Sequence, residues 1–338
     1  MKNNNKTRLA DKSISGLKEW PLILILAVVV FVFWSINKHY LSIGNIRGIF
    51  VSAFVMGILA VGAACLLMSG KIDLSAGNTG MLAGVLIAIL LSAGVHWIPA
   101  LLITLVFGAV TGLINAFFIN TMNFAPFIST LAISSIYSGV ALVATNSANI
   151  PIAAKENPVF ISLGSSNIWI FPVPFFILGI LLVVYGVILS ATGFGRRVYM
   201  TGGNPNAARL AGINPKKITT ILYVNNGAIA SLAGILFAAL MKMGSPLNVT
   251  GSDLDGIAAA LLGGVAFTGG KGNMFGVFIG ILLITSFQNG LRVAGLGPYY
   301  EVVAKGLLLI AALILDYFRE TIVSKSLKTG RHDSREPA

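Results

Sequence analysis

The chain is dominated by apolar runs of about 20 residues that alternate with short polar or glycine-rich links. An α-helix needs about 20 consecutive apolar residues to cross the hydrocarbon core of a bilayer. The 338 residues are 56% hydrophobic and only 10% charged, whereas soluble domains carry roughly 25% charged residues. The runs predict an all-α polytopic membrane protein with about ten transmembrane helices, at residues 20–36, 46–68, 74–92, 98–119, 127–144, 172–191, 218–241, 254–267, 274–293 and 299–317.

The distribution of Lys and Arg predicts how these spans are oriented. With the N-terminus inside, 17 of the 23 basic residues fall in inner segments, and the outer segments hold only Lys38, Arg47, Lys155 and Arg292. Basic residues accumulate on the cytoplasmic side of membrane proteins, so we expect both termini to be cytoplasmic. The net charge of +12 is then explained by the orientation of the chain in the membrane. We therefore expect no binding of nucleic acid.

This topology divides the chain into a basic cytoplasmic tail (1–19), a transmembrane domain (20–318) and a cytoplasmic C-terminal tail (319–338). Two long loops fall on opposite sides, residues 147–171 outside and 192–217 inside. The first 19 residues lack the short apolar core and cleavage site of a signal peptide, so we expect no cleavage. A single cysteine, Cys65, excludes a disulfide within the chain.

The inner loop contains the most specific segment of the chain, residues 202–214. Gly202, Gly203 and Pro205 interrupt any preceding helix, and Asn204 or Asn206 can cap a new one. Residues 207–211 are helix formers, and Gly212 can end the helix in a left-handed turn. We expect one or two helical turns with a face of small residues at the membrane surface, shaped for a groove on another protein. An ordinary interfacial loop is the alternative.

This segment resembles the cytoplasmic coupling segment of ABC-importer permeases of the ribose/monosaccharide type. The run Asn206-Ala207-Ala208 followed by Gly212 is similar to their Glu-Ala-Ala…Gly pattern, with Asn in place of Glu. Three further stretches agree with the family, at residues 70–77, 112–131 and 261–272, and Lys71 stands where the family more often has Gly. The resemblance covers roughly residues 45–318.

The resemblance implies a membrane pore subunit of an ATP-driven importer in the bacterial plasma (inner) membrane. Its expected partners are cytoplasmic ABC ATPase subunits, a second permease chain, membrane lipid, and an extracytoplasmic binding protein that delivers a monosaccharide or similar neutral polyol. The implied ATPase-coupling residues are Gly203, Asn204, Asn206, Ala207, Ala208, Arg209, Gly212 and Ile213. The chain itself would not be an enzyme, since the stretch Gly270-Lys271-Gly272 lacks the first Gly and the Ser/Thr of a phosphate-binding loop. We expect no cofactor or metal.

Neutral polar residues inside the predicted spans are candidates for the substrate path. Unpaired amides in hydrocarbon are costly, so these side chains must face other helices or water. Hydrogen bonds between helices are the simpler interpretation, and a weakly polar channel for a neutral polyol is the alternative. The candidates are Asn115, Ser134, Asn225, Asn226 and Asn289.

Several other features have mainly structural interpretations. Asp73 precedes the third span, and we expect it to cap that helix, with Ser75 as a second cap candidate and a substrate contact as the alternative role of Asp73. Glu301 and Lys305 are four residues apart and are expected to pair. The pairs Gly80/Gly84, Gly108/Gly112 and Gly276/Gly280 predict close helix packing, within or between subunits. The glycine-rich segments 69–80 and 263–272 are alike, and paired broken segments can mark a gate or site.

Two other classes of function remain open at this stage. A secondary transporter or facilitator of a small polar solute would normally need a titratable group deep in the bundle. A membrane enzyme would need a convergent catalytic set, and the spans show no cluster of His with carboxylates. Only the importer permease requires a helix with a small face in the inner loop.

Overall fold

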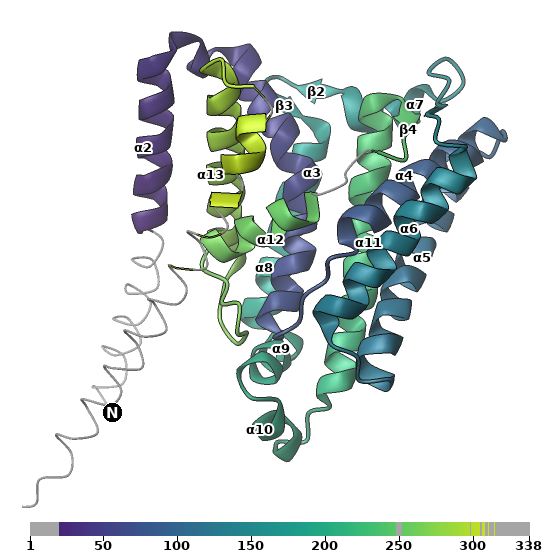
Figure 1. Ribbon diagram of the computed structural model, residues 1–338, viewed down its shortest axis with the longest axis vertical. Coiled ribbons are helices and arrows are strands. Elements are labelled where there is room, and N and C mark those ends of the chain that lie inside the picture. The colour runs from purple at the N-terminus through teal and green to yellow at the C-terminus, as the bar shows by residue number, and fades with distance from the viewer. Residues whose placement is uncertain are drawn as a thin grey trace, which may run out of the picture.

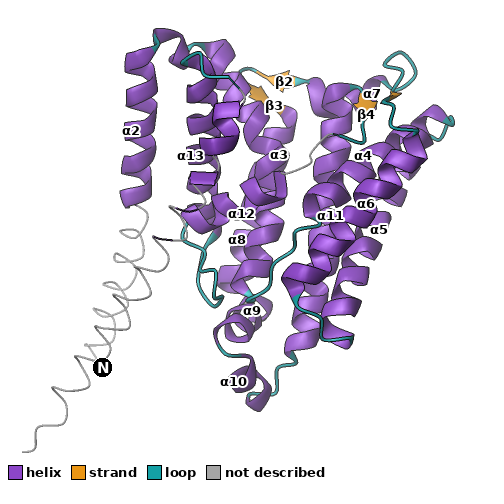
Figure 2. Cartoon of the chain, viewed as in Figure 1, coloured by secondary structure: helices purple, strands orange, loops and turns teal. Residues whose placement is uncertain are grey.

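The chain folds into a bundle of helices with only four strands of two residues each among the residues described (Figures 1 and 2). This computed structural model describes residues 20–247, 252–297, 299–304, 306, 307, 310 and 314. The helices are α2 (Trp20–Ile36), η1 (Lys38–Leu41), α3 (Ile43–Met68), α4 (Ala76–Ser92), α5 (Trp97–Ala116), η2 (Phe117–Thr121), α6 (Pro126–Thr145), α7 (Pro158–Ser165), α8 (Val173–Ala191), α9 (Gly193–Gly203), α10 (Pro205–Leu210), α11 (Pro215–Met241), α12 (Ser252–Leu262) and α13 (Met274–Val293).

Six of these helices are long and apolar enough to cross a membrane, within the part of the chain that is described. They are α3, the continuous helix formed by α5 and η2, α6, α8, α11 and α13, and the shorter helices α2 and α4 are also apolar. The prediction of a mostly helical polytopic membrane protein is confirmed. Helices α2 and α13 have the bounds predicted from the sequence.

The eighth predicted span, residues 254–267, is corrected by the structure. Its helix, α12, has 11 residues, which at 1.5 Å per residue gives a length of about 16 Å. The hydrocarbon core is about 30 Å thick, so α12 does not cross it alone and is continued by the glycine-rich link to α13. The tenth predicted span, 299–317, is helical at residues 299–304, and most of its remainder lies outside the described residues.

Helix α11 lies against both α4 and α5 through glycines (Figure 1). A Cβ atom added to Gly80 would lie 2.8 Å from the carbonyl oxygen of Ala230, and one added to Gly227 would lie 2.9 Å from the backbone nitrogen of Gly112. Neither position has room for a side chain, so the helix backbones are in direct contact. In the same way Gly280 meets the backbone of Ala259 on α12, and Gly276 meets the backbone of Gly263, the residue directly after α12. The three predicted glycine pairs therefore pack helices within the subunit.

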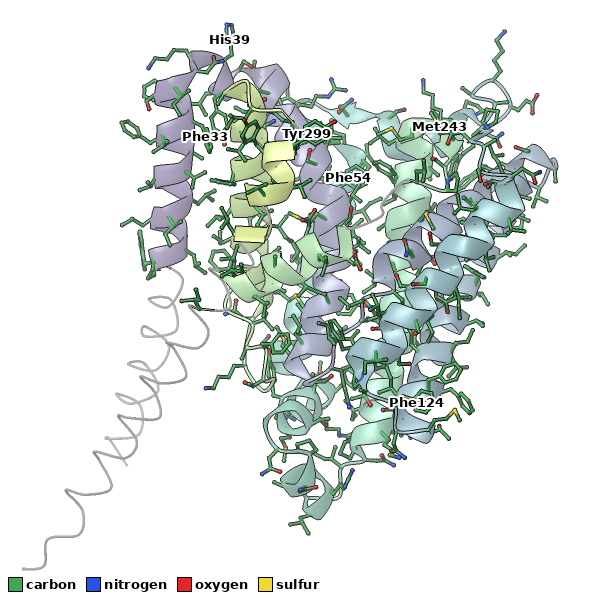
Figure 3. The ribbon with its side chains drawn as sticks, in the orientation of Figure 1. Phe33, His39, Phe54, Phe124, Met243 and Tyr299 are labelled. Atoms are coloured by element: carbon green, nitrogen blue, oxygen red, sulfur yellow. The ribbon has the colours of Figure 1, made fainter. Side chains whose placement is uncertain are left out.

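The two long loops lie at opposite ends of the bundle (Figure 1). At one end are α7 and two short antiparallel pairings, β1 (Ile150–Pro151) with β4 (Met243–Gly244) and β2 (Asn167–Ile168) with β3 (Phe171–Pro172). At the other end α9 and α10 project beyond the other described helices. Figure 3 shows His39, Met243 and Tyr299 toward the first end and Phe124 toward the second.

Glu301 forms an ion pair with Arg292, a partner that was not predicted. Its Oε1 atom lies 3.0 Å from Nε of Arg292, at the end of α13. Lys305, the expected partner, lies outside the described residues. The helical spacing of Glu301 and Lys305 could not show that the preceding turn brings Arg292 back toward the same carboxylate.

Candidate functional site

The projecting segment is built from two short helices with a defined cap between them. Helix α9 ends at Gly203, and the Asn204 side chain accepts hydrogen bonds from the backbone N–H groups of Asn206 and Ala207, each at 3.0 Å. These donors would otherwise be unsatisfied in the first turn of α10. Of the two cap candidates, Asn204 is therefore the cap, and Asn206 lies inside α10.

Helix α10 ends in the left-handed turn that Gly212 predicts. Gly212 has φ +76°, a region that glycine adopts without strain. The Ile213 N–H donates to the Ala208 carbonyl at 2.9 Å, and the Gly212 N–H donates to the Arg209 carbonyl at 3.0 Å. This pair of bonds defines a Schellman motif, so a six-residue helix has both ends fixed.

The two faces of α10 differ in exposure. Ala208 is fully buried against the rest of the protein, whereas Asn206, Ala207 and Arg209 are exposed. Leu210 at the tip is 92% exposed, although leucine is a residue that proteins usually bury. A capped helix with an outward face of small residues and one large apolar side chain is suited to insertion into a groove.

The base of this segment contacts two other links of the chain through backbone atoms. A Cβ atom on Gly202 would overlap the carbonyl oxygen of Met68 and would lie 2.7 Å from the nitrogen of Gly270. The Gly270 N–H itself donates to the Met68 carbonyl at 2.9 Å, and the Tyr199 hydroxyl donates to the Gly272 carbonyl at 2.9 Å. The α3–α4 link and the α12–α13 link, singled out as similar in sequence, therefore meet at the end of α9.

The α3–α4 link carries a buried carboxylate, Asp73, that joins this link to α5 and α11. Oδ1 of Asp73 accepts from the backbone N–H and hydroxyl of Ser75, at 2.8 and 2.6 Å. Nδ2 of Asn226 on α11 donates to Oδ2 at 2.8 Å, and Nδ2 of Asn115 on α5 lies 3.3 Å from Oδ2. We call Asp73, Ser75, Asn115 and Asn226 the Asp73 cluster.

The prediction that Asp73 caps the next helix is wrong. Ser75 occupies the cap position of α4, and its side chain makes no cap hydrogen bond. Asp73 is only 4% exposed, and besides Ser75 its donors are Asn115 and Asn226, which are far away in sequence and could not be found from spacing. Asn115 and Asn226 were path candidates, and their convergence on Asp73 was missed. In the sequence, the one feature that indicated a special structure at Asp73 was the glycine-containing break between two apolar runs at residues 70–77.

The remaining path candidates lie in separate contacts between helices. Asn78 on α4 donates to the Ser134 hydroxyl on α6 at 2.8 Å, and Asn45 on α3 donates to Oδ1 of Asn289 on α13 at 2.8 Å. The Tyr185 hydroxyl on α8 donates to Asn225 on α11. Each pair joins two helices by a hydrogen bond, which agrees with the simpler of the two interpretations made from the sequence, and Oδ1 of Asn78 and Nδ2 of Asn225 are left buried without a partner.

Two cavities lie close to the projecting segment. One has a volume of about 500 Å³, is almost entirely apolar and is lined by Cys65, Tyr185 and Asn225 among others. The other has a volume of about 350 Å³ and lies between α10, α11 and the α3–α4 link. Among the described residues, no three His, Cys, Asp or Glu side chains are grouped so that they could hold a metal ion.

Comparison with known proteins agrees with the sequence and the geometry. The family described as "Branched-chain amino acid transport system / permease component" matches residues 45–313. The ribose import permease protein RbsC of Escherichia coli K12 is 33% identical over 301 residues, covering 89% of this chain and 94% of that protein.

Two other relatives extend the comparison to other sugars. The D-allose transport system permease protein AlsC of the same organism is 33% identical, covering 88% of this chain and 91% of its own length. The L-arabinose transport system permease protein AraH is 31% identical, covering 88% of each chain. No solved structure matches the chain. The bundle contains several long apolar helices, and the relatives are bacterial permeases that the chain covers nearly end to end, so the chain is a multi-pass bacterial membrane protein. Because the family model matches most of its length, the chain belongs to the permease component family of branched-chain amino acid transport systems.

Proposed function

We propose that this chain forms half of the membrane pathway of an ATP-driven importer for a monosaccharide or similar neutral polyol. The observation that carries the proposal is the projecting segment α9–α10, whose capped tip is presented away from the other described helices. Its exposed residues Asn206, Ala207, Arg209 and Leu210 would enter a groove on a cytoplasmic ATPase. Asn204, Gly212 and Ile213 would hold the tip in shape through the two caps, and Gly203 would join α9 to the tip.

The proposed topology has ten crossings with both termini in the cytoplasm. Helix α12 and the glycine-rich link that follows it would make one short, broken crossing, and α13 would make the next one. The position of α7 and α9–α10 at opposite ends supports an external 147–171 loop and an internal 192–217 loop (Figure 1). In this topology the transmembrane domain comprises residues 20–318, and the two cytoplasmic tails comprise residues 1–19 and 319–338.

The proposed solute follows from the relatives and from the chemistry of the interior. The names of the relatives refer to ribose, D-allose and L-arabinose, which are all neutral monosaccharides. The buried polar groups on the helices are mainly neutral amides and hydroxyls, which suit hydroxyl groups better than ions. Asn115, Ser134, Asn225, Asn226 and Asn289 remain candidates for the path, with the Asp73 cluster as a structural group beside it.

The proposed partners are two ATPase subunits, a second permease chain and an extracytoplasmic binding protein. Movement of an ATPase would reach the membrane through α10. Because Gly202 and Tyr199 contact both glycine-rich links, the movement would pass to the α3–α4 and α12–α13 links together. This route gives a physical role to the two similar broken segments.

The topology is tested by labelling single cysteines with a reagent that does not cross membranes, in a background where Cys65 is replaced by Ala. We expect a cysteine at Lys155, in the loop before α7, to be labelled in intact cells. A cysteine at Arg197, which is exposed on α9, should be labelled only after the cells are broken. The opposite pattern would invert the topology and remove the coupling assignment.

The docking role of α10 is tested by Ala207→Glu. Residue 207 is exposed, and an acidic residue three positions after the Asn204 cap is compatible with the helix start, so α10 should remain folded. Burying that charge in a partner groove without a counter-charge is unfavourable, and we expect at least a roughly tenfold loss of ATPase affinity, or about 1.4 kcal/mol.

The measurement is co-purification of the ATPase at graded concentrations, together with uptake. Ala207→Ser is the matched control and should bind normally. Wild-type affinity in the Glu variant would contradict docking through α10. Gly212→Arg also prevents docking but is a poorer test, because a side chain at φ +76° strains the cap itself.

The driving force is tested with proteoliposomes that contain this chain, its ATPase and its binding protein. Enclosed ATP should drive accumulation of labelled ribose or a related monosaccharide, and a protonophore should leave it unchanged. Accumulation that needs a proton gradient but no ATP would support the alternative, a secondary transporter or facilitator.

A further inference from the structure

The 350 Å³ cavity beside α10 differs from the rest of the described interior in its charge. It is lined by Lys71 from the α3–α4 link, Arg209 from α10 and Lys216 from the start of α11, and none of its lining residues is Asp or Glu. We call it the basic pocket. Three cations from three separate segments face one space. The ion pair of Arg292 with Glu301 involves none of the residues that line the pocket.

The two lysines are held near each other without a counter-charge. Nζ of Lys216 donates to Oδ1 of Asn123 at 3.0 Å, so the lysine is positioned by a neutral partner. Lys71 is half-buried, and burial together with the charge of Lys216 lowers its pKa. An anion in the pocket would offset both the burial of Lys71 and its repulsion by Lys216, since an opposite charge favours the protonated form of an amine.

Thr201 provides a second and independent indication of a ligand. It lines the pocket, is 2% exposed, and its hydroxyl has no hydrogen-bond partner. Buried threonines elsewhere in the helices donate to the carbonyl four residues earlier, as Thr104, Thr145 and Thr285 do at 2.7 to 2.8 Å. A buried hydroxyl that makes no such bond leaves a donor unsatisfied, which is costly unless something else accepts from it.

We propose that the basic pocket binds a phosphate group, as a monoester with two negative charges, at the end of the protein that carries α9–α10. A phosphate presents three acceptor oxygens, which matches two ammonium groups, one guanidinium and one hydroxyl. The volume of about 350 Å³ lies in the range of small-molecule sites, so it accommodates a small organic substituent as well. The bound group would connect α10, α11 and the α3–α4 link.

Two sources supply this chemistry, a small phosphorylated solute in the cytoplasm or the monoester headgroup of phosphatidic acid. The test uses the full chain, delipidated and purified in dodecyl maltoside with chloride as the only other anion. Isothermal titration is carried out with inorganic phosphate, with glycerol 3-phosphate and with dioctanoyl phosphatidic acid. Tighter binding of phosphatidic acid by tenfold or more identifies a lipid, and equal binding of glycerol 3-phosphate identifies a solute.

The variants Lys71→Gln, Arg209→Gln and Thr201→Val test the pocket. We expect each loss of a cation to weaken phosphate affinity by about tenfold, and Thr201→Val to weaken it by a smaller factor, because hydrogen bonds to charged groups are stronger than neutral ones. Arg197→Gln is the matched control, an exposed arginine of α9 outside the pocket, and its affinity should equal that of the wild type. Arg209 is exposed, so its replacement keeps the test valid if a buried variant fails to fold.

Absence of saturable binding of any of the three probes would overturn the proposal. Equal weakening by Arg197→Gln and Arg209→Gln would also overturn it, since the effect would then be one of overall surface charge. If no phosphate binds but the Lys71 and Arg209 variants lose ATPase binding, the pocket receives a partner carboxylate instead. These results are distinct from failure of the importer proposal, because the titration requires neither ATPase nor transport.

Discussion

Replacing Gly202 by alanine is expected to abolish uptake and to lower the stability of the purified chain by about 3 kcal/mol or more. The added Cβ atom would overlap the carbonyl oxygen of Met68 and lie 2.7 Å from the nitrogen of Gly270. Both neighbours are backbone atoms, which cannot rotate away as a side chain can. Overpacking of a core typically costs 1–3 kcal/mol when neighbours adjust, and here the two links must separate.

The adjacent glycine supplies the control for this prediction. Gly203 lies in the same last turn of α9, and a Cβ atom there would meet nothing within 4 Å. Gly203→Ala should therefore keep the melting temperature of the wild type, measured by size-exclusion chromatography after heating. Equal melting temperatures for both alanine variants would show that α9 does not pack on the two links as described.

Replacing Asp73 by leucine is expected to have the second large effect, a loss of nearly all folded transporter. The substitution keeps a branched side chain of similar shape but removes the acceptor for Ser75 and Asn226. Each buried donor left without a partner lowers the free energy of unfolding by on the order of 1–3 kcal/mol. Hydrogen bonds between helices inside a membrane often contribute less than this to stability. The measurement is the yield of monodisperse protein and initial uptake at equal expression.

Asp73→Asn separates hydrogen bonding from charge. Oδ1 of Asn226 has no partner in the structure, so a flipped Asn226 amide can accept from an asparagine at position 73. We expect this variant to keep at least about a third of wild-type uptake and an unchanged insensitivity to protonophore. If Asp73→Asn were as inactive as Asp73→Leu in a folded protein, the carboxylate charge would be required and proton coupling would gain support.

The sequence was sufficient for most of the long apolar helices and for the local shape of the projecting segment. The length of an apolar helix is set by residues that follow one another along the chain. The two caps of α10 are set by Asn204 and Gly212, which lie within ten residues of each other. Both are local properties. The bounds of α2 and α13 could be read directly because their runs end at polar or turn-forming residues.

The candidate site could be predicted only in part, because its contacts join residues far apart. Asp73 meets Asn115 and Asn226, which are 42 and 153 positions away, and no pattern along the chain encodes that meeting. The same limit explains why the contact of Arg292 with Glu301 was not predicted. The docking of α10, the path residues and the partners remain proposals that the experiments above address.

The direct contact of α11 with α4 and α5 has a consequence for suppressor genetics. When a mutation enlarges a residue that faces a side chain, a second mutation that trims the neighbour can restore the fit. Gly80 and Gly227 face the backbone of Ala230 and Gly112, and every amino acid carries the same backbone atoms. A defect caused by Gly80→Val therefore has no compensating change at its contact position, and revertants should restore a small residue at position 80 itself.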